Sequence, residues 1–306
     1  MTTTTTGPVD ATHAAGRKTS PGAPRRFARR KRGAEDAAQR GGPVWALLAW
    51  ALTLLFFAPV AWMVLTSLHQ EVDAATNPPS IFAPLTFKQY GLLFDRGVGP
   101  YLINSATASI LSTILVLVLA LPAAYALSIK PVEKWTDVMF FFLSTKFLPP
   151  IAALLPIYLI VKDLGMLDNV YTLVILYTSM NLPIAIWMMQ SFLAEVPKEM
   201  LEAAEVDGAG LLRTLWYIVR PVTMPGIAAT ALICFIFSWN EFLFALNLTA
   251  TRASTAPVFL VGFISSQGLF LAKLCAAATL VSLPVLIAGW AAQDKLVRGL
   301  SLGAVK

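Results

Sequence analysis

Long apolar stretches alternate with short polar connections along the chain, which is the pattern of a protein that crosses a membrane several times. A helix needs about 20 apolar residues to span the ~30 Å hydrocarbon core of a bilayer. Six segments meet this requirement, at about 44–68, 102–128, 138–161, 172–193, 225–247 and 272–292. The pattern therefore predicts an all-α polytopic membrane protein with six transmembrane helices.

Prolines interrupt five of the six predicted spans, and the third span contains three of them, Pro149, Pro150 and Pro156. A proline inside a helix removes a backbone donor and frees a carbonyl. Within a bilayer the freed group must find its partner in a neighbouring helix or a water-filled cavity. We therefore expect the third helix to be bent and to line a path.

Charged residues are few and unevenly placed. They make up 13% of the chain, whereas a soluble domain carries about 25%. Residues 1–42 hold nine Lys/Arg and three Asp/Glu, so the whole net charge of +6 belongs to this segment. With almost no large apolar residues it cannot bury enough surface to fold, so we expect a disordered basic cytoplasmic tail beside membrane lipid. Such a tail accounts for the basic pI without a nucleic-acid partner.

The placement of lysine and arginine sets the expected orientation. If the N-terminus is cytoplasmic, eight basic residues besides the tail fall on the inner side and three on the outer side. The inner residues are Lys130, Lys134, Lys198, Arg213, Arg220, Lys295, Arg298 and Lys306, and the outer residues are Lys88, Arg96 and Arg252. This excess follows the positive-inside rule and predicts that both termini are cytoplasmic.

Several classes of function are excluded by what the sequence lacks. Both cysteines lie in apolar runs, so no disulfide framework is expected. His13 and His69 lie far apart with no carboxylate cluster, so we expect no metal site. There is no G-x-x-x-x-G-K-[ST] loop for phosphate binding, so ATP is not expected to bind to this chain. No cluster of nucleophile and base lies in the spans, so an enzyme is not expected.

The polar connection at about 194–224 is unusually ordered for a loop. Pro197 is suited to open a helix, and the following helix carries three glutamates spaced by three, Glu199, Glu202 and Glu205. Ala203 and Ala204 keep the neighbouring surface thin, so that a partner can approach closely. Gly208 can end the helix in the left-handed conformation. The alternative, an amphipathic helix resting on the membrane, would favour a basic polar face, whereas this one is acidic.

The same segment carries a family resemblance. Glu202-Ala203-Ala204, Gly208, Ile218 and Pro221 resemble the signature loop of bacterial ABC importer permeases, with Arg220 where the family usually places leucine. The likeness covers about residues 44–306. Asn104-Ser105, Trp239-Asn240-Glu241-Phe242 and the motif at 296–306 look like carbohydrate-importer permeases of the maltose type. The segments 144–150 and 256–263 look like the sorbitol/mannitol branch.

The resemblance implies a transmembrane domain at 43–306 in a bacterial inner membrane. It implies that the chain forms half of a path for a sugar or sugar alcohol, with a second permease subunit as the other half. The loop helix would dock on an ATP-binding cassette subunit, where Glu202 meets a basic residue. The partner would use the ATP, no cofactor would be bound by this chain, and an extracytoplasmic solute-binding protein would deliver the substrate.

Four polar residues inside the predicted spans are candidates for the substrate path. They are Lys146, Asn181, Asn240 and Glu241. Ionisable residues within a membrane are costly and often functional, and amides and a carboxylate suit the hydroxyl groups of a polyol. The structural alternative for each is a hydrogen bond between helices.

A different class of transporter also fits the spans. The chain could be a self-sufficient secondary transporter that uses Lys146 or Glu241 as a proton-linked group. Such carriers often contain internal repeats, and no clear repeat is present here. Dependence of uptake on ATP or on a proton gradient distinguishes the two classes.

Overall fold

The computed structural model describes residues 43–76, 80–129, 134–265 and 268–303. The chain divides into two compact units, residues 1–59 and 60–306. The boundary falls inside the first helix, α2 (Pro43–Ser67), at Pro59. The first unit contributes the described residues 43–59 of α2. The expected tail at 1–42 lies outside the described residues.

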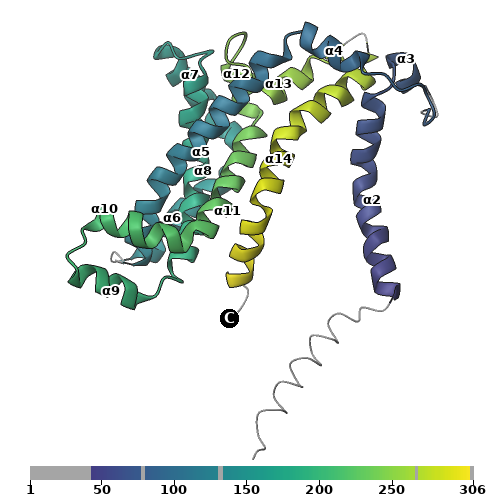
Figure 1. The fold of residues 1–306 in the computed structure, drawn as a ribbon. Helices are drawn as coiled ribbons and strands as arrows, with labels where there is room; N and C mark the ends of the chain where they lie inside the picture. Colours follow the sequence, from purple (N-terminus) through teal and green to yellow (C-terminus); the bar gives the residue numbers. More distant parts are fainter. Residues whose placement is uncertain (1–42, 77–79, 130–133, 266–267, 304–306) are drawn as a thin grey trace, which may run out of the picture. The chain divides into compact units, whose positions relative to one another are not determined.

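The second unit is almost entirely helical (Figure 1). Two short helices, α3 (Glu71–Ala74) and α4 (Lys88–Asp95), precede the long α5 (Val98–Ser128). The chain continues through α6 (Trp135–Ser144), the 3-10 turn η1 (Thr145–Phe147), α7 (Pro150–Asp163), α8 (Val170–Leu193) and α9 (Lys198–Val206). It ends with α10 (Leu211–Thr214), the π-helical η2 (Leu215–Val219), α11 (Arg220–Trp239), α12 (Leu243–Leu248), α13 (Ala256–Val261) and α14 (Leu271–Gly303), with a small antiparallel pair, β1 (Ile264–Ser265) and β2 (Gly268–Leu269), before α14.

Five described helices are long and apolar enough to cross a membrane, and a bent pair makes a sixth span if its halves are counted together. The bent pair is the predicted third span. Its halves, Trp135–Phe147 and Pro150–Asp163, meet at 88°. The bend expected from Pro149 and Pro150 is thus confirmed. The helix bends here because neither proline can donate the hydrogen bonds that would continue it.

The fifth span differs from its predicted bounds of 225–247. Helical structure runs from Leu211 to Trp239 and then breaks before α12. Pro221 therefore lies within a long helix rather than ahead of one. The wider π-helical turns of η2 come just before Pro221. Pro221 has no N–H, so one α-helical hydrogen bond to the preceding turn is missing.

The core of the second unit lies where α5, α8 and α11 pack against one another. Small side chains let the helices approach, as expected inside a membrane: Ala120 and Ala124 on α5 and Ala185 on α8 are fully buried. Trp239 fixes the outer part of α11 to α14, because its indole N–H donates to the Val281 carbonyl at 3.1 Å.

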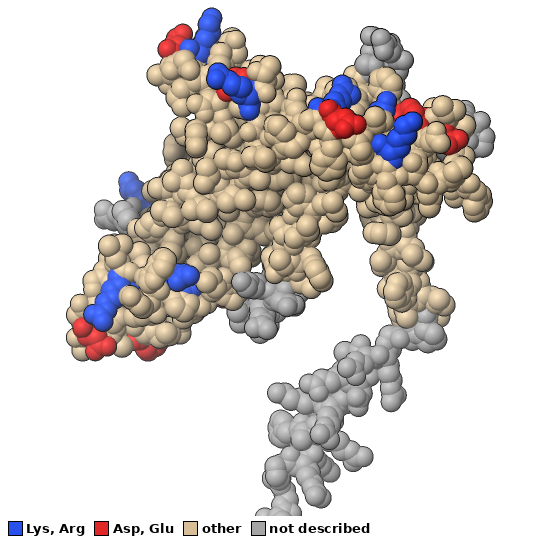
Figure 2. Space-filling view, turned by 45° about the horizontal axis from the view of Figure 1, so that its top comes forward, with Lys and Arg blue, Asp and Glu red and all other residues tan. Residues whose placement is uncertain are grey.

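Charged side chains of residues 60–306 gather towards the two ends of the helices (Figure 2). We call the end that carries α9 the cytoplasmic end and the end that carries α4, α12 and α13 the outer end, following the predicted orientation. Lys162, late in α7, and Lys273, early in α14, also lie at the outer end. The sequence-based count omitted both. Among the residues that the structure describes, six of the inner basic residues therefore stand against five at the outer end.

Candidate functional site

The cytoplasmic hairpin forms as its sequence predicts. Pro197 precedes α9, and Gly208 follows it at φ +70°. The Ala209 N–H donates to the Ala204 carbonyl at 2.9 Å, and the Gly208 N–H donates to the Glu205 carbonyl at 3.1 Å. These two bonds form a Schellman motif, which needs a residue at positive φ and so favours glycine.

One face of α9 packs on the rest of the chain and the other is open. Leu201 and Ala204 are 8% and 3% exposed, whereas Glu199, Glu202 and Ala203 are exposed. The expectation that both alanines thin the open surface is therefore wrong for Ala204, which lets α9 sit close to its own bundle. A cavity of about 290 Å³ lies between α9 and the cytoplasmic end of α5, with Glu202 in its lining.

The second arm of the hairpin places the remaining signature residues. Ile218 is half-buried within η2, and Pro221 is exposed in the first turn of α11. The Arg220 guanidinium lies 4.3 Å from the centre of the Trp216 ring. The departure from leucine at position 220 thus gives a cation–π contact on the hairpin.

A second cavity lies at the bend of the third span, between it, α8 and the start of α12. It has a volume of about 230 Å³, and its lining includes Lys146, Leu148, Pro149, Pro150, Ser179, Met180, Pro183 and Phe244. The Lys146 ammonium donates to the Met180 carbonyl at 2.8 Å. Pro183 cannot donate to the carbonyl of Ser179, the residue before Met180, so α8 lacks one backbone hydrogen bond in this region. Lys146 ties the bent third span to α8 and also lines the cavity.

The other three path candidates lie elsewhere. Asn181 is 3% exposed and donates to the Ser238 hydroxyl at 2.9 Å. Ser238 in turn lies 3.0 Å from the Ser112 hydroxyl, so the three side chains join α8, α11 and α5. This arrangement corresponds to the structural alternative for Asn181, a hydrogen bond between helices.

Asn240 and Glu241 occupy the break between α11 and α12. The Asn240 amide donates to the Ile236 carbonyl of its own helix at 2.8 Å. The Glu241 carboxylate accepts from the backbone N–H groups of Phe244 and Ala245, at 2.8 and 3.2 Å. Glu241 therefore caps α12 at its N-terminus, where a negative charge is favourable. Each of these side chains stabilises the break.

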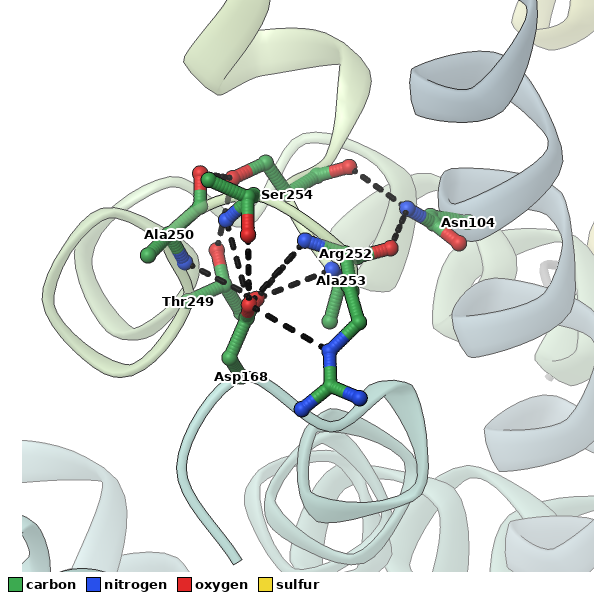
Figure 3. A network of polar contacts seen from close by, with 8 residues as sticks. Asn104, Asp168, Thr249, Ala250, Arg252, Ala253 and Ser254 are labelled. Atoms are coloured by element: carbon green, nitrogen blue, oxygen red, sulfur yellow. Dashed lines mark hydrogen bonds and ion pairs between the residues drawn. The ribbon is translucent and has the colours of Figure 1, made fainter.

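A polar network at the outer end was not predicted from the sequence (Figure 3). Asp168, in the loop between α7 and α8, accepts hydrogen bonds from the N–H groups of four consecutive residues, Ala250, Thr251, Arg252 and Ala253, at 2.9 to 3.2 Å. Burial alone would raise the pKa of the Asp168 carboxyl, but these four donors hold it well below its usual value. The partners lie more than 80 positions away in sequence, so no local pattern could reveal them.

These features define a class of protein. A helical membrane bundle with broken spans around a cavity and an ordered cytoplasmic hairpin is the architecture of a transport permease. Residues 116–300 match the family described as "Binding-protein-dependent transport system inner membrane component". The chain belongs to this family.

Relatives along nearly the whole chain agree with this assignment. The chain is 38% identical to the "Probable ABC transporter permease protein y4oR" of Sinorhizobium fredii, over 86% of this chain and 95% of the relative. It is 30% identical to the "Trehalose transport system permease protein SugB" of Mycobacterium tuberculosis, over 87% and 98%. It is also 30% identical to the "Melibiose/raffinose/stachyose import permease protein MelC" of Bacillus subtilis, over 85% and 95%.

A solved structure has the same fold. It is described as a bacterial ABC transporter involved in the import of the acidic polysaccharide alginate, and it matches with a TM-score of 0.69. At 22% identity it covers 85% of this chain and 98% of the chain in that structure. The likeness supports the helical architecture.

Family membership decides between the classes of transporter that the sequence left open. The chain is an inner-membrane permease component of a binding-protein-dependent ABC transport system, and it is not an enzyme. ATP is used by the partner ATPase, and a binding protein is a further partner. A self-sufficient, proton-linked carrier is therefore rejected.

Proposed function

We propose that this chain forms half of the translocation path for a neutral sugar or sugar alcohol, such as sorbitol or mannitol. A second permease subunit forms the other half. Helix α9 docks on the ATP-binding subunit, so that closure of the ATPase dimer moves the hairpin and switches the path between its inward-facing and outward-facing states. The signature residues Glu202, Ala203, Gly208, Ile218 and Pro221 shape this docking element, and Ala204 seats it on the bundle.

The open acidic face of α9 carries the coupling proposal. The Schellman bonds end the helix at a defined residue, and Leu201 and Ala204 pack one of its sides on the bundle. A rigid helix can transmit a push, whereas a mobile loop would absorb it. Glu202 is exposed and also lines the cavity beside α5, so a basic side chain of the partner can reach its carboxylate there.

A charge reversal tests the coupling. In the assembled transporter, Glu202→Lys places two like charges at the interface and is expected to abolish ATP-dependent uptake while the chain stays in the membrane. Glu199→Lys is the matched control, because Glu199 is exposed one turn earlier on the same helix. The proposal fails if Glu202→Lys transports normally, or if both variants lose ATPase binding equally.

The cavity at the helix breaks supports a small neutral substrate. Its volume of about 230 Å³ suits a single sugar unit, and ligand pockets usually combine apolar walls with a few polar groups. The polar side chains in its lining are those of Thr145, Lys146 and Ser179. Trehalose, melibiose and raffinose, named for relatives, are likewise neutral polyhydroxyl compounds. We assign Lys146 to the path, and Asn181, Asn240 and Glu241 to positioning the helices around it.

Substrate-stimulated ATP hydrolysis by the reconstituted transporter tests this assignment. Sorbitol, mannitol and trehalose are compared, each with the binding protein present. Lys146→Met is expected to raise the concentration of sugar needed for half-maximal uptake, while Lys162→Met at the outer surface is not. Stimulation by trehalose alone would exclude the polyol, and an unchanged Lys146→Met variant would remove Lys146 from the path.

A further inference from the structure

The outer half of the second unit contains two helices that follow breaks. Helix α7 begins after the bend at Leu148–Pro149, and α12 begins after the break at Asn240–Phe242. They pack against each other through Val161 of α7 and Phe244 and Leu248 of α12, which form one buried apolar cluster. We call these two helices and the loops that follow them, 164–169 and 249–255, the outer pair.

The outer pair lies directly beside the cavity at the breaks. Pro150, Ala153 and Ile157 from α7 and Phe244 from α12 belong to the lining of that cavity. Both helices lie towards the outer end (Figure 1), and each contributes to the lining of the cavity. A movement at the two breaks would therefore shift the outer wall of the cavity.

Asp168 joins the two loops of the outer pair. Besides the four backbone N–H groups, the Thr251 hydroxyl lies 3.1 Å from its carboxylate, and the Arg252 Nε lies at 4.0 Å. Its own N–H donates to the Leu248 carbonyl at 2.8 Å. A carboxylate that accepts several N–H bonds makes charge-assisted hydrogen bonds, which are about twice as strong as neutral ones.

The loop at 249–255 is also tied to α5. The Asn104 amide donates to the carbonyls of Arg252 and Ser254, at 2.8 and 3.0 Å (Figure 3). These two hydrogen bonds are fewer than those that the Asp168 carboxylate accepts, and neither involves a charged group. Each bond that Asp168 accepts between the two loops is therefore stronger than each of these neutral bonds to α5.

We propose that the outer pair is a gate over the cavity at the helix breaks, and that Asp168 is the positioning residue that makes α7 and α12 move as one piece. The inference rests on the proposed function in taking this cavity as part of the translocation path. The breaks at Leu148–Pro149 and Asn240–Phe242 supply the hinges, because a chain turns most easily where helical hydrogen bonds are missing. The low pKa of Asp168 keeps the tie charged at any physiological pH.

Thiol labelling tests the gate without knowledge of the substrate. A cysteine replaces Ser179, which is exposed in the cavity lining, in the full transporter in spheroplasts. A membrane-impermeant thiol reagent is added from outside. Losing even one charge-assisted hydrogen bond raises the population of an open state about tenfold or more, so Asp168→Ala is expected to raise the labelling rate by about that factor. Asp163→Asn, a change to an exposed carboxylate at the end of α7, is expected to leave it unchanged.

A covalent replacement separates the gate from a general loss of stability. Asp168→Cys with Thr251→Cys is oxidised to a disulfide, which joins the same loops without the charge, and labelling is expected to return to the wild-type rate. Native Cys234 is fully buried and reports unfolding, while Cys275 is replaced by alanine. The proposal is overturned if Asp168→Ala labels at the wild-type rate, if the disulfide does not restore protection, or if Cys234 becomes reactive together with Ser179→Cys. Loss of ATP-dependent uptake in the disulfide form would also overturn it, whereas absence of ATP-dependent uptake in the wild type would contradict the proposed function alone.

Discussion

A single glycine lets α8 and α11 meet at the cytoplasmic end, and we expect Gly226→Ala to be strongly destabilising. A Cβ atom added at Gly226 would lie 2.2 Å from the Phe192 Cγ, 2.4 Å from its Cδ2 and 2.8 Å from its Cβ. Rotation of the ring cannot clear all three contacts, because the Cβ of Phe192 is fixed to the backbone of α8. The two helices must therefore separate.

The magnitude follows from this geometry. Overpacking a well-packed core costs about 1–3 kcal/mol, and a clash that moves whole helices belongs at the upper end, about 3 kcal/mol. For a unit of this size each kcal/mol shifts the melting temperature by about 2–4 °C, so Gly226→Ala is expected to lower Tm by about 6–12 °C. Thermal unfolding of the detergent-solubilised chain measures this shift.

Two controls make the measurement specific. A Cβ added at Gly289, inside α14, meets nothing within 4 Å, so Gly289→Ala is expected to be neutral or to stabilise by up to about 1 kcal/mol through helix propensity. In a Phe192→Ala background the two ring contacts are absent and only the contact with the Cβ of residue 192 remains, so Gly226→Ala should cost less there, and a double-mutant cycle measures the difference as a coupling energy. A Tm within about 2 °C of the wild type for Gly226→Ala would refute the packing argument, since about 3 kcal/mol is expected to give at least about 6 °C.

Three further predictions concern the polar contacts. The pKa of Asp168 is lower in the folded chain than in the unfolded chain, where it is about 3.9. The stability that its charged hydrogen bonds contribute is therefore complete above pH ~4 and is lost as the pH falls below that value. The difference in Tm between wild type and Asp168→Asn should be constant from pH 7 to 5 and shrink below pH 4, and a difference that changes between pH 7 and 5 would contradict this role of Asp168. Asn181→Ala removes a hydrogen bond between helices and should cost about 0.6 kcal/mol, and at most about 1.7; in that background Ser238→Ala should cost only its remaining bond to the Ser112 hydroxyl, and fully additive losses would show separate roles. Glu241→Gln weakens the cap of α12 and should cost about 0.5–2 kcal/mol, measured by thermal unfolding, without changing the substrate KM; a raised KM would return Glu241 to the substrate path.

The hairpin is the part of the molecule that the sequence predicts best, because every signal in it is local. Pro197 and Gly208 mark the ends of α9, and both positions are confirmed. Ala204 shows the limit of this reasoning. The spacing of the glutamates indicates one exposed face, but only the packing of α9 on the bundle decides which alanine lies opposite that face.

The spans were predicted in number and type, since apolar length alone decides them. Their interruptions were predicted only where proline marks them. The break between Trp239 and Leu243 has no proline, and it depends on Glu241 accepting the N–H groups of α12. A carboxylate that caps an internal helix looks, in sequence, like a carboxylate that binds a substrate. The network around Asp168 lies beyond any sequence pattern, because its partners come together only after α7 and α12 have packed.

The polar residues within the spans share one physical constraint. Every break in a membrane helix leaves backbone groups that lipid cannot satisfy, so a polar side chain beside a break already has a structural task. Asn240 and Glu241 perform that task within their own segment, and Asn181 joins α8 to α11 and α5 through Ser238. Lys146 alone among the four candidates both bonds to the backbone of another helix and lines a cavity. A hydroxyl-bearing substrate that displaced its ammonium from the Met180 carbonyl would release the tie between the bent third span and α8. Substrate binding and helix movement would then be linked at a single side chain, which is why Lys146 is the residue to test first in the path.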